Sequence, residues 1–321
     1  MIFIDTDKNL ARGKENPVKV VINFDQRTKV RGIHATFHAA ERTTATYTVT
    51  RTDSKGRTKT ETRTAVEYVD IAKEEFLLFG DPPLGCFKGM WDAIATLFGG
   101  GKHKIVDAGQ KHFDLSVQIP ESSPPSFKGK KCEVFYRVSV QVDVPVKWDM
   151  RDSLDFEVKR LESEFDSNPM HVVFPDESGR SFWDKLFGKN VTLNLALEKD
   201  LLACGEKAMA MLTVETPDPF DVNKISVRLI GRESSFARGH ADGYEHAHAL
   251  EDIDSPGVIS GESTFRFEVD IPQIDGPFTQ EGTKFSIEWR IEVQLHIPWS
   301  KDPTISVPIK LVPNPPNKKL K

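Results

Sequence analysis

The strongest constraint on the fold of this chain is that it repeats its own pattern. The segment that starts at Gly13 matches the segment that starts at Gly205 over about thirty residues without a gap, at a constant separation of 192 residues. Apolar residues alternate with polar ones in both copies, which is typical of β-strands that bury one face. The chain is therefore expected to contain two similar β-domains.

Two further pairs of segments extend this match. Phe113–Pro120 (FDLSVQIP) matches Phe265–Pro272 (FRFEVDIP) at a separation of 152 residues, and Tyr136–Pro145 matches Trp289–Pro298 at a separation of 153 residues. The fall from 192 to 152 indicates that the first copy carries about 40 additional residues ahead of Phe113. We expect the same strands in both copies and an insertion in the first.

The spacing of the alternating segments predicts the fold class. Short apolar–polar runs are separated by proline and glycine, and few long helical periods compete with them, so the pattern favours an all-β chain of two tandem antiparallel β-sandwiches. The predicted organisation is an N-terminal sandwich at 1–160, a linker at 161–189, a C-terminal sandwich at 190–313 and a basic tail at 314–321.

The first part of the insertion predicts a projecting hairpin. The threonine-rich run Thr43–Asp70 indicates two β-prone arms around a turn at Asp53–Gly56, with little apolar surface to bury. Positive side chains outnumber negative ones near the tip, which predicts a basic arm that contacts an acidic protein partner. A solvated hairpin whose charges discourage aggregation is the alternative. The candidate partner-binding residues are Arg51, Lys55, Arg57, Lys59 and Arg63.

The second part of the insertion predicts one short amphipathic helix. Apolar residues recur at helical spacing between Met90 and Phe98, and three glycines follow. We expect this helix to dock on the first sandwich. Its apolar residues Trp91, Leu97 and Phe98 are also candidates for contact with a partner or for peripheral association with a membrane.

Charge and composition exclude several classes of protein. The net charge is −5, and it divides into +4 for residues 1–160 and −9 for residues 161–321, so neither half is basic enough to predict nucleic-acid binding. No run of eighteen apolar residues predicts a membrane span. The three cysteines are far apart and lack the spacing of a metal site, which favours a reducing cytoplasm.

Motifs that carry chemistry are scarce. The chain has no glycine-rich phosphate loop, nucleophile elbow or paired-histidine zinc motif, so we expect neither an enzyme nor a bound cofactor. A polar loop, His240–Asp254, is the best candidate for a metal site. His246 and His248 would face the same way on an extended chain and are weak metal-ligand candidates.

The repeated blocks together resemble the arrestin fold. The resemblance covers most of the chain from Gly13 to Pro313, and the run HFDLSVQIPESSPPSFKG resembles the amino-domain signature of that family. The segments that carry the resemblance are Gly32–Phe37, Glu41–Arg42, Ala108–Gly109, His112–Pro120, Pro125–Phe127, Tyr136–Val138, Gly205–Glu206, Ile225–Leu229 and Val307–Ile309.

The resemblance implies a binding scaffold. Arrestins, arrestin-domain trafficking adaptors and the bacterial sporulation-control proteins similar to them all look like binding scaffolds and not like enzymes. The leading hypothesis is thus a non-catalytic cytosolic adaptor that binds a protein partner through its sandwich faces and loops. Two alternatives remain open: a β-sandwich binding module for a carbohydrate or small ligand, and a metal-dependent hydrolase that uses the loop His240–His248.

Overall fold

The computed structural model describes residues 1–5, 9–80, 104–145, 148–160, 170–174, 191–299 and 302–313. These residues form strands, turns and loops and contain no helix, and so no helix among them is long and apolar enough to cross a membrane. The expected helix with Trp91, Leu97 and Phe98 lies outside the described residues. So do the tail and most of the linker.

The described strands of the first half form three sheets. A three-stranded sheet has the order β1-β3-β8, a six-stranded sheet has the order β2-β11-β10-β5-β6 with β9 beside β10, and β4 pairs with β7. The strands are β1 (Ile2–Asp5), β2 (Asn9–Leu10), β3 (Glu15–Phe24), β4 (Thr28–Val30), β5 (Gly32–Thr52), β6 (Thr58–Gly80), β7 (Lys104–Val106), β8 (Gly109–Gln118), β9 (Phe127–Lys128), β10 (Cys132–Asp143) and β11 (Met150–Val158).

The strands of the second half are hydrogen-bonded into one network with the order β12-β13-β15-β18-β19-β14, to which β16 adds beside β15 and β17 beside β18. The strands are β12 (Met170–Phe174), β13 (Thr192–Leu197), β14 (Leu201–Ala203), β15 (Lys207–Ala237), β16 (His240–Asp270), β17 (Gln280–Glu281), β18 (Phe285–His296) and β19 (Thr304–Val312).

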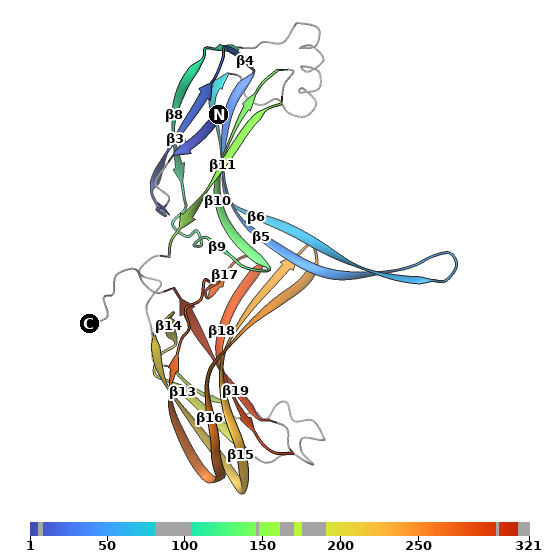
Figure 1. Ribbon diagram of the computed structural model, residues 1–321, viewed down its shortest axis with the longest axis vertical. Coiled ribbons are helices and arrows are strands. Elements are labelled where there is room, and N and C mark those ends of the chain that lie inside the picture. The colour runs from blue at the N-terminus through green and yellow to red at the C-terminus, as the bar shows by residue number, and fades with distance from the viewer. Residues whose placement is uncertain are drawn as a thin grey trace, which may run out of the picture. The chain divides into compact units, whose positions relative to one another are not determined.

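The long hairpin of β15 and β16 supplies both layers of the second sandwich, and the two strands run side by side along their length (Figure 1). The first part of β15, up to Glu215, pairs with β13, and the later part, from Lys224, pairs with β18. Register shifts between Thr216 and Phe220 and between Val222 and Lys224 separate the two parts. Bulges of this kind bend a strand, which allows β15 to pass from one layer to the other.

The fold class is confirmed: the chain forms two tandem β-sandwiches in which almost every strand pair is antiparallel. The short pairs β2–β11 and β14–β19 are parallel. By compactness the chain divides into unit 1 (Met1–Thr43, Val66–Lys128 and Glu133–Arg160) and unit 2 (Thr44–Ala65, Gly129–Cys132 and Leu161–Lys321). The predicted domain boundaries stay a prediction.

The pairing of the strands follows the repeat in the sequence. Val20 of β3 pairs with Phe113 of β8, and the residues that match them, Leu212 and Phe265, pair with each other in β15 and β16. The same holds for the last two strands of each sandwich, because the pair Tyr136–Phe156 corresponds to the pair Trp289–Ile309 at a separation of 153 residues. The two sandwiches thus share strand order and register.

Tyr136 and Trp289, which match each other, are the largest fully buried side chains among the residues that the structure describes. The Tyr136 hydroxyl donates a hydrogen bond to the carbonyl oxygen of Pro124 at 2.5 Å, and the Trp289 indole Nε1–H donates one to the carbonyl oxygen of Pro277 at 3.0 Å. Burial raises the pKa of Tyr136 to about 12. Each core therefore places a large ring at the same point and satisfies its polar atom in the same way.

Candidate functional site

A tight turn closes the tip of the β5–β6 hairpin, as the sequence predicts. The backbone N–H of Asp53 donates to the carbonyl oxygen of Arg57 at 2.9 Å, and Gly56 has a φ of 76°, which glycine adopts without strain. The Asp53 carboxylate accepts the N–H groups of Lys55 and Arg57, each at 2.9 Å. These bonds and the Arg57 guanidinium lower the pKa of Asp53. One acidic residue thus organises the turn.

The five basic residues proposed for partner binding all lie on this hairpin, but they are not equivalent. Arg57 Nε lies 3.1 Å from Asp53 Oδ2, while Glu61 pairs with both Lys59 and Arg63 at 3.2 and 3.1 Å. Within the described part of the chain, Arg51 and Lys55 form no ion pair and no side-chain hydrogen bond, and both are exposed.

Threonine covers one face of this hairpin. The hydroxyls of Thr52 and Thr58 are 3.4 Å apart across the strands, in the same register as the backbone hydrogen bond from Asp53 to Arg57. Alternation then places eight exposed threonines on one face: Thr46, Thr48, Thr50, Thr52, Thr58, Thr60, Thr62 and Thr64. Threonine favours strands, and Thr–Thr pairs across a ribbon stabilise it, so the arms can form strands without a large apolar face.

The base of the hairpin is anchored within unit 2, although the sequence predicted little apolar surface there. Ala45 and Ala65 are buried with Ala237 of β15 in one small cluster, and Tyr47 packs against it. The Tyr47 ring stacks on His240 with centroids 3.7 Å apart and planes at 5°. The exposed tip therefore extends from a fixed base.

A buried carboxylate adds a second anchor in unit 2. Glu233 of β15 has a fully buried side chain that accepts the backbone N–H groups of Lys130 and Lys131 at 3.1 and 2.9 Å. Its Oε1 lies 2.7 Å from His246 Nε2. A β-carbon at Gly129 would clash with this carboxylate, so only glycine allows the turn to approach so closely.

Burial alone would raise the pKa of Glu233, but the backbone N–H groups of Lys131 and Lys130, together with the His246 ring, outweigh it and lower the pKa. Asp242 of β16 behaves similarly. Burial opposes ionisation, whereas Lys131 Nζ at 2.6 Å and the Thr46 N–H at 2.7 Å favour it, and the pKa falls to about 2. Two ionised carboxylates therefore hold the segments 44–65 and 129–132 to β15 and β16.

The polar segment from His240 is a strand, so its prediction as a loop was wrong. Every residue of the segment His240–His248 pairs with β15. The segment is polar and lacks the apolar–polar alternation that predicts a strand, so its sequence did not indicate this pairing. His246 and His248 do share one face, because both rings stack on Trp289 at centroid distances of 6.0 and 6.1 Å. No group of three or more His, Cys, Asp or Glu side chains within the described ranges could hold a metal ion.

One set of side chains in unit 2 has the connectivity of a catalytic triad, which the sequence did not reveal. Ser226 Oγ lies 3.0 Å from His296 Nε2, and His296 Nδ1 lies 2.8 Å from Asp302 Oδ2. This order of serine, histidine and aspartate is the one that activates a serine nucleophile. However, Ser226 also hydrogen-bonds Asp252, and its one proton cannot be donated to Asp252 and His296 together.

The repeat shows what Asp302 does. Its Oδ1 accepts the N–H of Ile297 at 3.1 Å, and its Oδ2 accepts Gln294 Nε2 at 3.3 Å, which closes the loop between β18 and β19. In the first sandwich Asp149, at a separation of 153 residues, accepts the matching N–H of Val144 and the matching Gln141 Nε2. Asp302 therefore closes its loop as Asp149 does in the first repeat, and this role accounts for its presence.

The exposed aromatic residues bear on the carbohydrate alternative. Trp148 and Trp299 are almost completely exposed, and each lies in the loop that joins the last two strands of its own sandwich. These two tryptophans therefore lie in loops and not in a row on one sheet face, which is the arrangement that a sandwich binding sugars would need.

Comparisons with known proteins decide the family. The model of the arrestin (or S-antigen) N-terminal domain matches residues 92–162, and the model of the C-terminal domain of the same proteins matches residues 188–316, so together they cover more than half of the chain. The chain belongs to the arrestin-like fold family. A search of curated proteins finds no match.

This membership confirms the resemblance seen in the sequence and agrees with the repeated register of the two sandwiches. Arrestin domains are characteristic of non-catalytic, protein-binding scaffolds, and the chain is consistent with that kind of protein. The anchors Glu233 and Asp242 were missed as sites. Glu233 could have been singled out because it matches Glu41 in the repeat, although its partners Lys130 and Lys131 are distant in sequence.

Proposed function

We propose that this protein is a non-catalytic cytosolic adaptor that binds an acidic protein partner through the tip of the β5–β6 hairpin. The observation that carries the proposal is the contrast between the two ends of this hairpin. The base is fixed by buried alanines and a stacked tyrosine, whereas the tip presents Arg51 and Lys55 without an ionic partner in the described residues.

The location of free positive charge supports an acidic partner. Exposed ion pairs contribute only about 0–1 kcal/mol each, so Arg57, Lys59 and Arg63 stabilise the hairpin weakly and remain able to exchange partners. Complementary surface charge mainly raises the rate of association and confers sensitivity to salt. The free thiols of Cys132 and Cys204, which are buried, agree with a reducing compartment.

A comparative capture experiment tests this function. Purified wild-type chain and the variant Arg51→Glu/Lys55→Glu are used to capture proteins from the native cell, and the captured proteins are quantified by mass spectrometry. The control is Lys14→Glu/Lys29→Glu, which makes the same charge change at exposed residues of unit 1. We expect a set of proteins that wild type and control retain and the hairpin variant loses; identical sets from all three would refute the role of the tip.

A further inference from the structure

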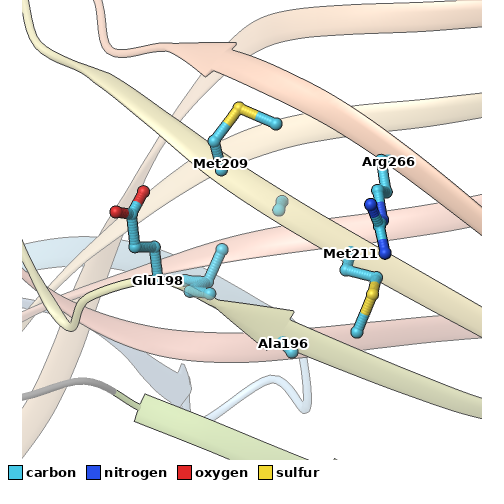
Figure 2. Close-up of a pocket in the computed structure, with 7 residues that line it drawn as sticks. Ala196, Glu198, Met209, Met211 and Arg266 are labelled. Carbon is cyan, nitrogen blue, oxygen red and sulfur yellow. The ribbon is translucent and has the colours of Figure 1, made fainter.

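A shallow hollow of about 230 Å³ lies on the sheet face formed by β13, β15 and β16, within unit 2 (Figure 2). Met209 and Met211 of β15 line it together with Ala196 of β13. Glu198 lies next to Met209, because its N–H donates to the Met209 carbonyl oxygen, and Arg266 of β16 pairs with Met211. An apolar centre is thus flanked by one negative and one positive side chain.

The repeat shows that the fold does not need these methionines. The buried positions of β15 keep their apolar character, since Val18 and Val20 of β3 match Ala210 and Leu212. The outward positions do not, because Pro17 and Lys19 stand where Met209 and Met211 stand in the second sandwich. Met209 is 45% exposed, so it adds little to the core.

The two charged side chains beside the hollow, Glu198 and Arg266, have no ionic partner among the described residues. In the part of the chain that the structure describes, neither the Glu198 carboxylate nor the Arg266 guanidinium forms an ion pair or a side-chain hydrogen bond. On β15 and β16, by contrast, Lys207 forms ion pairs with Glu268 and Asp270. Glu198 and Arg266 are therefore free to bind charges that a ligand brings.

We propose that this hollow is a second contact site, which takes one large apolar side chain from an extended segment of a protein partner. The segment would place a basic residue at Glu198 and an acidic residue at Arg266. The volume is below the range of about 300–1,000 Å³ that small-molecule pockets have, but it suits one large side chain. Flexible thioether side chains adapt to different apolar groups and are common on surfaces that bind peptides.

This inference rests on the adaptor function proposed above, but it does not depend on the hairpin. The test uses the full chain with ¹³C-labelled methionine methyl groups, assigned with Met209→Leu and Met211→Leu. The probes are synthetic peptides Gly-Lys-Gly-X-Gly-Glu-Gly, in which X is Leu, Phe or Ala. Alternate residues of an extended peptide share one face, so Lys, X and Glu all point toward the sheet.

We expect the Leu and Phe peptides to shift the methyl signals of Met209 and Met211 saturably, while Met150 of unit 1 stays unchanged. The Ala peptide should bind at least about fivefold more weakly, since it buries less apolar surface. The variant Glu198→Lys/Arg266→Glu should bind the original peptides weakly and prefer peptides in which Lys and Glu are exchanged. Absence of saturable shifts, or equal binding of the Ala peptide, would overturn the proposal.

The hairpin variant Arg51→Glu/Lys55→Glu separates this inference from the proposed function. It should bind the Leu peptide like the wild type, because the hollow contains no hairpin residue. If that variant also captures partners like the wild type, the role of the hairpin fails and the hollow stands. If the hairpin variant loses the peptide, the peptide binds elsewhere and the proposal for the hollow fails.

Discussion

Replacing Glu233 by alanine should destabilise unit 2 far more than a typical loss of one charge. The fully buried carboxylate accepts two backbone N–H groups, from Lys130 and Lys131, and contacts His246. A buried donor without a partner costs about 1–3 kcal/mol. Water that enters the vacated space can satisfy part of this loss. We therefore expect the free energy of unfolding to fall by about 2–4 kcal/mol.

The assay combines urea unfolding with amide hydrogen exchange of the peptide that contains Lys130 and Lys131. Glu233→Gln keeps the size of the side chain and one accepting oxygen, and it should lose about half as much free energy as Glu233→Ala. Glu262→Ala, which removes an exposed glutamate from β16, should change the free energy by less than about 0.5 kcal/mol. If Glu233→Ala loses less than about 1 kcal/mol and exchange at both amides is unchanged, the anchor is not formed as described.

Three further predictions concern the acid response, the repeated core and the absence of catalysis. The pKa of Asp242 is lowered to about 2, so the ionised carboxylate stabilises the fold fully above the unfolded-state pKa near 3.8, and this stabilisation is lost as the pH falls through the folded value. In Asp242→Asn, the free energy of unfolding should therefore fall less between pH 5 and pH 2 than in the wild type, by about 1 kcal/mol after solvent screening. In urea unfolding, Tyr136→Phe should lower the free energy of unfolding by about 1 kcal/mol, because it removes only the hydrogen bond to Pro124. Trp289→Ala should lower it by about 3–5 kcal/mol, because it removes the hydrogen bond to Pro277 and also leaves a cavity. Equal losses for the two variants would contradict the account of the two cores. Ser226→Ala should leave the rate of p-nitrophenyl acetate hydrolysis unchanged, and a serine-dependent rate would show instead that Ser226, His296 and Asp302 act as a triad.

The sequence predicted the two sandwiches because one face of each strand is buried, which imposes a period of two on the apolar residues. Val20 and Leu212 occupy matched buried positions for this reason, and the strand register followed from the same alignment. The aspartates that close the loops, Asp149 and Asp302, lie at the same separation of 153 residues and could have been found by extending the alignment.

The candidate site was predicted less completely, because its organisation depends on residues that are distant in the sequence. The five basic residues of the hairpin could be identified from the sequence. Their ion pairs could not, because the pairing of Lys59 and Arg63 with Glu61 depends on how the side chains pack. The anchor of Glu233 needs a turn about 100 residues earlier in the chain. The early part of β16 was missed because its polar residues give no alternation, although its backbone pairs fully with β15.

The most direct measurement of the adaptor mechanism is the affinity of a captured partner for the wild type, the hairpin variant Arg51→Glu/Lys55→Glu and the control Lys14→Glu/Lys29→Glu, at low and high salt. We expect the hairpin variant to bind about 5–30-fold more weakly than wild type at low salt, since two exposed contacts of up to about 1 kcal/mol each are lost. Screening by salt should reduce this difference in affinity between the wild type and the hairpin variant at high salt. The control should bind like the wild type at every salt concentration. Equal affinities of wild type and hairpin variant at low salt would contradict the account and show that the partner binds elsewhere on the sandwiches.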